Sequence, residues 1–442
     1  MFAASSKQKT TSSSAPQTLN TEIIYARVIG IMASSRDTVS IDTLFCYELS
    51  PYPSAMFDEN GELRSTNKSV LKNKIKVECG QRNKEPPVVV ILDGCAILWT
   101  VPWPASPAKV SAFVNNAVAT ITKYVQTTQI LHVVFDRYYN DSIKSCCRTK
   151  RAQGFCREYR LTSESPLPKQ SIVLKVAANK VQIIKLIVDQ LCLIQIADGK
   201  QVIITGPDPH PIEVSTGVQR SPVTHEEANV LIVYHMIQEA VAGHSPIKVV
   251  CDDTDVLLIL AHHLHANTNN MSHTVKLFME SCSKNRAIID VNEVVKKHSK
   301  IMPNLLGAHA ITGCDTVSCF AGIGKTTVFK KLEAFPDSLK LGDTSTSLED
   351  ITASCLDFVA TLYGQKAGDQ MNAMRATIFR RKIGGKRHVP PKLSSLPPTM
   401  AAFRPHCQRA HYQTALWKAA DKPSPPNKNR PCFNQCTLLE VS

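Results

Sequence analysis

The sequence predicts an α/β fold whose central sheet is mostly parallel. Short apolar runs at 88–92, 132–135 and 247–251 have the length and the β-branched content of buried strands. Helical patterns separate these runs, and strands that alternate with helices are typical of parallel sheets built from crossover units. Each run is followed directly by aspartate, so acidic side chains are expected where the strands end.

The remaining elements follow in order along the chain. We expect strands at 88–93, 129–135, 201–205 and 247–251, the third of them ending in a Gly-Pro-Asp-Pro turn. Apolar residues at helical spacing predict helices at 107–126, 172–195, 224–242 and 256–262. Thr224 with Glu227 three residues later matches a capping box, which favours a helix start at Thr224. A further helix is expected after Gly324, ending near residue 333.

Composition divides the 442 residues into five segments. They are a disordered polar tail (1–21), a segment of unclear fold (22–86), the α/β domain (87–345), a helical C-terminal extension (346–421) and a proline-rich tail (422–442). The chain has no apolar signal core and no membrane-length apolar stretch, so we expect an intracellular protein without a membrane partner. The net charge of +14 suits a polyanion such as nucleic acid.

The strand-end aspartates are the candidate functional residues. Asp93 and Asp136 each follow one predicted strand, and Asp252, Asp253 and Asp255 follow another. Ligands of an open parallel sheet bind beyond the carboxyl ends of its strands. Carboxylates gathered there repel one another unless a cation holds them, and Mg²⁺ prefers such oxygens. A metal site is therefore predicted, although a single strand-end aspartate can also simply cap the next helix.

Basic residues and a glycine turn lie near these acids in the sequence. Residues 137–160, expected to be helical from about 140, contain seven Lys or Arg and two acids, a surplus of five. Such a surplus beside acids favours phosphate contact. The Gly322-Ile323-Gly324 turn before a helix exposes backbone N–H groups that can hold a phosphate. It is not a P-loop, because residue 319 is Cys where that motif needs glycine.

The order of these motifs resembles the PIN-like superfamily of metal-dependent nucleases and, within it, the flap endonuclease branch. The resemblance spans about 87–335. It rests on Leu92-Asp93-Gly94, Val134-Phe135-Asp136-Arg137, His225-Glu226-Glu227-Ala228-Asn229, Asp252-Asp253-Thr254-Asp255 and Gly313-Cys314-Asp315-Thr316, followed by Gly322-Ile323-Gly324-Lys325. The whole chain also looks like a group of uncharacterised multi-copy animal proteins with a PIN-like domain.

The resemblance implies a PIN-like three-layer fold with a helix–turn–helix grip on the duplex backbone. The implied activity is hydrolysis of phosphodiester bonds in structured nucleic acid, DNA rather than RNA, with two divalent ions, Mg²⁺ or Mn²⁺. The implied metal ligands are Asp93, Asp136, Glu227, Asp253, Asp255 and Asp315. The implied catalytic residues are Lys144, Arg148 and Arg151, basic side chains that would steady the scissile phosphate. The implied nucleic-acid contacts are Arg137, Lys150, Gly322, Gly324, Lys325 and Thr326. Such a substrate and the basic cluster at 380–387 favour a nuclear location.

One departure from the family pattern leaves an alternative open. The pattern has a second acid two positions after Glu227, and this chain has Asn229 there. Asparagine can coordinate a cation through its carbonyl oxygen but brings no charge, so one metal would bind more weakly. A degenerate protein that binds nucleic acid without cleaving it is therefore the main alternative. A different α/β enzyme of nucleotides or small phosphorylated substrates is less favoured, because neither GxGxxG nor a P-loop is present.

Overall fold

A central sheet organises the chain. The computed structural model describes residues 21–34, 41–79, 85–138, 157–266, 275–283, 287–335, 337–383 and 392–427. Within these residues, an eight-stranded sheet has the order β5-β4-β3-β2-β1-β6-β7-β8. The parallel strands are β1 (Val89–Asp93), β2 (Ile130–Val134), β3 (Gln201–Thr205), β6 (Ile247–Val250) and β7 (Leu277–Glu280). The antiparallel strands at the margins are β4 (Ile212–Glu213), β5 (Val218–Gln219) and β8 (Ile288–Asp290). The predicted α/β class with a mostly parallel sheet is confirmed.

The strand order reverses between β1 and β6. The chain passes from β1 to β2 and β3 on one side, and then returns to place β6 and β7 on the other side of β1. A crevice opens at such a switch point, because the connections on its two sides lead away from each other. The ends of β1 and β6 border this crevice. Asp93 is the last residue of β1, Asp253 lies just beyond β6, and both are candidate site residues.

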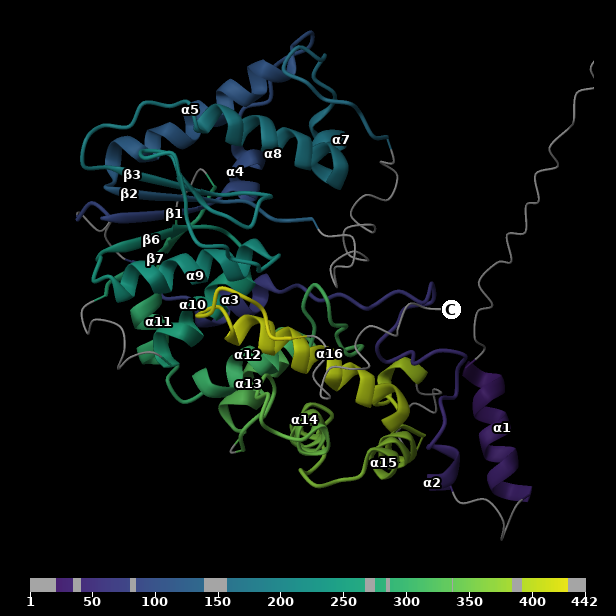
Figure 1. Cartoon of the computed structure of the whole chain (residues 1–442). Helices are drawn as coiled ribbons and strands as arrows, with labels where there is room; N and C mark the ends of the chain where they lie inside the picture. Colours follow the sequence, from purple (N-terminus) through teal and green to yellow (C-terminus); the bar gives the residue numbers. More distant parts are fainter. Residues whose placement is uncertain are drawn as a thin grey trace, which may run out of the picture.

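Helices cover both faces of the sheet and make a three-layer arrangement (Figure 1). One face carries α4 (Gly94–Thr100), α5 (Val110–Thr127), α7 (Gln170–Lys175) and α8 (Ala177–Leu191). The other face carries α9 (Ala228–Val241), α10 (Thr254–Ala266) and α11 (Val291–Lys297). Each layer of helices shares its own hydrophobic core with one face of the sheet, so strand residues alternate between the two cores.

More helices extend the α9–α10 side. They are α12 (Met302–Ile311), α13 (Lys325–Glu333), α14 (Leu348–Leu362), α15 (Met371–Ile383) and α16 (Met400–Lys418). Phe403 and Trp417 of α16 are buried in the same core as α9 and α10, so α16 is part of the main body. In the described part of the chain, no helix is both long and apolar enough to cross a membrane.

The N-terminal segment contributes three helices. α1 (Thr21–Ser34) and α2 (Ile41–Leu44) lie beside α15, where Val28 and Phe45 share a small core with Phe379. α3 (Ser69–Ile75) instead packs against α10 and α13, and its Leu71 and Ile75 are buried in the main core. The segment for which the sequence predicted no fold therefore supplies a helix next to the switch point.

Two local differences from the sequence predictions have physical reasons. Helix α4 starts directly after Asp93. It was not predicted, because its seven mostly apolar residues are too few to show a helical spacing in the sequence. Helix α9 begins at Ala228, so the predicted capping box at Thr224 is wrong. The side chain of Thr224 donates to Ser424 instead, and the backbone N–H of Ala228 is satisfied by Asp136 from β2. A contact from a distant strand has replaced the local cap.

Gly94 is required by close packing. An added Cβ at this position would lie 2.5 Å from Cε1 of Phe135, far inside van der Waals contact. Asp93 and the start of α4 can therefore approach the end of β2 only because residue 94 lacks a side chain. The Leu92-Asp93-Gly94 motif thus has a steric explanation, and it brings Asp93 toward Asp136.

Candidate functional site

Asp93 and Asp136 each lie at the start of a helix. Asp93 Oδ1 accepts a hydrogen bond from the Ala96 N–H at 2.9 Å, in the first turn of α4. Asp136 Oδ1 accepts from the Ala228 N–H at 3.0 Å, at the start of α9. Helix N-termini favour negative charge, so both carboxylates have partial compensation from the backbone.

The two carboxylates are close enough to perturb each other. Burial, followed by the charge of Asp136, raises the pKa of Asp93 from 3.8 to about 6, although the Ala96 N–H lowers it. Asp93 Oδ2 also accepts from the Cys251 thiol at 3.3 Å, at the end of β6. A cation between Asp93 and Asp136 would relieve this repulsion. The donor set is the oxygen type that Mg²⁺ and Mn²⁺ prefer.

A second acidic group surrounds Lys68, which directly precedes α3. The Lys68 Nζ atom lies 2.8 Å from Asp315 Oδ1, 3.0 Å from Asp255 Oδ2 and 3.7 Å from Asp253 Oδ1. Burial lowers the pKa of Lys68, but the three carboxylates more than offset this and raise it above its ordinary value. The ammonium is therefore charged at neutral pH. We call Asp253, Asp255 and Asp315 the acid trio.

The start of α9 connects the two acidic groups. Its Asn229 amide lies 3.4 Å from Asp253 Oδ2, while the preceding residue contacts Asp136. Glu227 is buried at the N-cap of the same helix, 3.5 Å from the Gln413 amide of α16. Cys251 completes the connection, because its sulfur contacts both Asp93 and the backbone of Asp253.

The six predicted metal ligands therefore lie along one edge of the sheet, at the switch point. Asn229 also lies at this edge, next to Asp253. Their binding of metal stays a prediction. Among the described residues, no three His, Cys, Asp or Glu side chains are arranged so that they could hold a metal ion.

Only part of this edge suits a divalent ion. Asp93 and Asp136 fit one, because Mg²⁺ is commonly held by one or two carboxylates together with water and substrate phosphate. The acid trio does not fit a second ion as its side chains stand, because Lys68 already lies among them. The expectation of two ions stays a prediction, although Lys68 lies where the acid trio would hold one of them.

Lys180 of α8 is a basic residue of the site that the sequence did not indicate. Its Nζ lies 5.8 Å from the centre of the Tyr138 ring, just after Asp136. Burial lowers the pKa of Lys180, but the nearby Cys95, Tyr138 and Asp136 more than offset this and raise it. The residue lies in an ordinary amphipathic helix far along the chain, so only the packing of α8 on the sheet reveals it.

Arg137 is a structural residue rather than the predicted nucleic-acid contact. Its side chain is fully buried, and Nε donates to the Gly206 carbonyl at 3.0 Å. The guanidinium also donates to the carbonyls of Asp208, Val223 and His225. It fixes the chain that leads into α9, so it cannot also reach a phosphate. The other predicted basic residues, Lys144, Arg148, Lys150 and Arg151, lie outside the described residues.

The glycine turn has the predicted form, but its lysine points inward. Gly322 is exposed with φ +78°, a conformation that favours glycine, and Gly324 is exposed at the N-cap of α13. Thr326 in the first turn is half-buried. Lys325 is buried, and its Nζ donates to the His309 carbonyl at 2.8 Å and to Thr312 Oγ1 at 3.0 Å. The prediction that Lys325 contacts nucleic acid is therefore wrong.

Lys325 instead connects the turn to the acid trio. Burial lowers its pKa to about 7, although nearby Cys314 and Asp255 oppose this. Its partner His309 contacts Asp255 Oδ1 through Nε2 at 2.9 Å, and burial lowers the pKa of His309 to about 4. At neutral pH this imidazole is uncharged and donates its Nε2 hydrogen to the carboxylate. The α12–α13 turn and the acids are thus held in one hydrogen-bonded group.

Comparisons with known proteins find matches only among solved structures. No family model matches the sequence, and no curated protein matches it. Among solved structures, the chain is similar to the bacteriophage T5 D15 protein co-crystallised with metal ions, with 11% identity, a TM-score of 0.39, and coverage of 79% of this chain and 96% of that one. It is also similar to the bacteriophage T5 D15 flap endonuclease in a pseudo-enzyme–product complex with DNA and metal ions, with 11% identity, a TM-score of 0.40 and the same coverages of 79% and 96%. TM-scores below 0.5 do not decide a function, so the proposal below depends on this chain's own residues.

The raised pKa of Asp93 predicts a pH-dependent stability. A carboxyl whose pKa is higher in the folded state stabilises the fold below its unfolded pKa, and that stability is lost as pH rises through the folded pKa. In metal-free buffer, Asp93→Asn should therefore match the wild type near pH 4. Above pH 6 it should be more stable, by on the order of 3 kcal/mol for a shift of about two pKa units. Denaturant unfolding across this pH range measures the difference, and parallel profiles would contradict the burial of a charged Asp93.

The buried guanidinium predicts a structural phenotype for Arg137. Arg137→Ala should lower the free energy of unfolding by about 3–5 kcal/mol, because several buried carbonyls lose their donor. Arg157→Ala, which removes an exposed arginine of the same basic segment, should change stability by less than about 0.5 kcal/mol. Denaturant titration compares the two variants. Equal, small effects would show that Arg137 is not held as described.

Proposed function

We propose that the protein is a PIN-like nuclease that hydrolyses phosphodiester bonds in structured nucleic acid, DNA rather than RNA, with bound Mg²⁺ or Mn²⁺. The observation that carries the proposal is the pairing of Asp93 and Asp136 at the switch point, with Asp253 linked to them through Cys251. Burial and the charge of Asp136 raise the pKa of Asp93, so the pair favours a positive partner. The proposal extends to a nuclear location, which the basic cluster at 380–387 favours and which microscopy of the tagged chain tests.

Positive and hydrogen-bond-donating groups near the acids support a phosphate-containing substrate. The Lys180 ammonium lies beside Asp136, where it can pair with a substrate phosphate. The exposed Gly322 and Gly324 open α13, whose first N–H groups can hold a second phosphate further along the strand. The net charge of +14 of the chain favours its attraction to a polyanion.

The residues divide the chemistry between them. When bound, a divalent ion would lower the pKa of a coordinated water and offset charge on the phosphate. Asp93 and Asp136 would hold this ion, and the helix N-termini that bind their other oxygens keep them oriented. Lys180 would hold the phosphate in place, and Asp253, whose side chain is 30% exposed, is the acid that water reaches most easily in the trio.

The alternative is a PIN-like protein that binds nucleic acid without cleaving it. Two observations favour it: Asn229 brings no charge where the family pattern has an acid, and Lys68 offsets one charge of the acid trio. Both reduce the negative charge available for cations. Neither affects Asp93 and Asp136, so one ion position is retained and the nuclease stays the better supported function.

Cleavage assays test the proposal directly. The full-length protein should cut labelled flap, duplex or single-stranded substrates in Mg²⁺ or Mn²⁺, but not in EDTA. Asp136→Asn keeps the oxygen that accepts from Ala228 and loses the charge, so turnover should fall by on the order of 100-fold with the fold intact. Asp189→Asn on the exposed side of α8 is the matched control and should cleave like wild type. Tight binding without cleavage in either metal would establish the alternative instead.

Salt dependence tests the predicted basic contacts. Replacing Lys144, Arg148 and Arg151 together with Ala should weaken nucleic-acid binding and flatten the plot of log affinity against log salt, because each lost phosphate contact releases one counterion fewer. Lys325→Gln should leave this slope unchanged, since its ammonium is used internally. Fluorescence anisotropy over a salt series measures both slopes. An unaltered slope in the triple variant would show that these residues form an ordinary solvated face.

A further inference from the structure

The position of Lys68 is the unusual feature of this acidic edge. Three carboxylates from two parts of the chain surround one ammonium: Asp253 and Asp255 lie where β6 leads into α10, and Asp315 follows α12. The contacts to Asp255 and Asp315, at 3.0 and 2.8 Å, are within hydrogen-bond range. An ammonium has three N–H donors and so matches several acceptors at once. This is the position in which carboxylates would otherwise need a metal ion.

The backbone holds Lys68 in this position. The residue directly precedes α3, whose Leu71 and Ile75 are buried in the main core with exposed fractions of 1% and 0%. The helix packs against α10 and α13, the elements on either side of the acids. On the acid side, Asp255 is 2% exposed and is fixed by the imidazole of His309 at 2.9 Å. Both partners are thus set by packing, which distinguishes this contact from a mobile surface ion pair.

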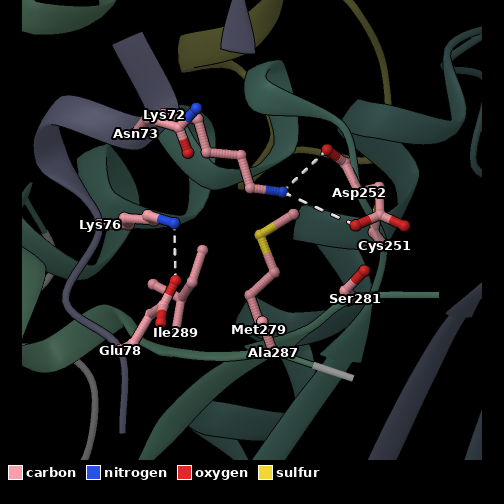
Figure 2. Close-up of a pocket in the computed structure, with 10 residues that line it drawn as sticks. All are labelled: Lys72, Asn73, Lys76, Glu78, Cys251, Asp252, Met279, Ser281, Ala287 and Ile289. Atoms are coloured by element: carbon pink, nitrogen blue, oxygen red, sulfur yellow. Dashed lines mark hydrogen bonds and ion pairs between the residues drawn. The ribbon is translucent and has the colours of Figure 1, made fainter. Parts of the chain in front are cut away.

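Lys72 provides a contrast on the same helix. One turn further along α3, its Nζ donates to the Asp252 carbonyl at 2.9 Å and lies 3.9 Å from Asp252 Oδ1. Lys72 lines a small cavity of about 130 Å³ together with Lys76, Met279 and Ser281, among other residues (Figure 2). Lys72 therefore contacts the same β6–α10 turn from outside the acid trio. Lys72 therefore serves as a control: it comes from the same helix but does not contact the acid trio.

We propose that Lys68 is a built-in second cation of the site, whose ammonium occupies the place of a divalent ion among Asp253, Asp255 and Asp315. A metal ion could enter the trio only by displacing an ammonium that would lose its partners inside the protein, which is strongly unfavourable. The chain therefore binds a single divalent ion, at Asp93 and Asp136. This inference deepens the proposed function, on which it rests for that single ion, and it explains how the site tolerates Asn229.

Metal binding in the absence of nucleic acid tests the proposal. Full-length wild type, Lys68→Gln, Lys68→Arg and Lys72→Gln are titrated with Mn²⁺, and free Mn²⁺ is followed by electron paramagnetic resonance. Lys68→Gln should bind one Mn²⁺ more than wild type, because the three carboxylates then lack a positive partner and attract the ion. If wild type binds an ion there weakly, Lys68→Gln should bind that ion at least about 10-fold more tightly. Lys68→Arg keeps the charge and Lys72→Gln lies outside the trio, so both should match wild type.

Two results would overturn the proposal. One is a Lys68→Gln protein that binds no more Mn²⁺ than wild type. The other is a wild type that already binds two ions with Lys68 in place, which needs no variant and so decides the matter even if Lys68→Gln fails to fold. Thermal unfolding with and without Mn²⁺ adds a second readout, since a new ion site should enlarge the metal-dependent rise in Tm of Lys68→Gln.

The outcome is distinguishable from a failure of the proposed function. If the wild type binds no Mn²⁺ and cleaves no nucleic acid, the proposed ion at Asp93 and Asp136 and the nuclease function are refuted. A single ion gained on Lys68→Gln would still establish the role of Lys68. If the wild type cleaves nucleic acid and Lys68→Gln gains no ion, the nuclease function is supported and the proposed role of Lys68 is refuted.

Discussion

Repulsion between carboxylates is the constraint on which the rest of the structure depends. The parallel sheet brings the ends of β1, β2 and β6 to one edge, and Asp93, Asp136 and Asp253 come with them. Each nearby element supplies a different compensation. The first turns of α4 and α9 donate backbone N–H groups, His309 donates from α12, and Lys68 brings a full positive charge from before α3. The surrounding helices thus offset the negative charge of this edge.

The same compensation joins the parts of the chain. Lys68, which directly precedes α3, belongs to the N-terminal segment, and Gln413 of α16 belongs to the C-terminal one. Lys68 contacts Asp255, and Gln413 contacts Glu227. Lys325 and His309 connect the glycine turn to Asp255 through hydrogen bonds. A phosphate bound at the turn would therefore lie against a framework that also positions the carboxylates. The acidic edge and the turn form one connected site.

The sequence predicted the strands and the positions of the acids at their ends, but not the surroundings of the basic residues, for a physical reason. Buried parallel strands leave a local apolar pattern, and Asp93, Asp136 and Asp253 directly follow it. The role of a lysine or arginine depends on what surrounds it after folding. Arg137 and Lys325 have the sequence context of phosphate contacts but are buried against carbonyl groups. Lys68 and Lys180 reach the acids from distant segments, and no spacing rule indicates them. The helix start at Ala228 was missed likewise, because its cap comes from β2.

We propose that one divalent ion and one internal ammonium share the acidic edge. A crystal structure of the full chain grown with Mn²⁺ tests it most directly, because anomalous scattering locates the metal without assumptions about activity. We expect one strong peak within coordination distance of Asp93 and Asp136, with the Lys68 Nζ still in contact with Asp255 and Asp315. A Mn²⁺ peak among Asp253, Asp255 and Asp315, with the Lys68 side chain displaced, would contradict it.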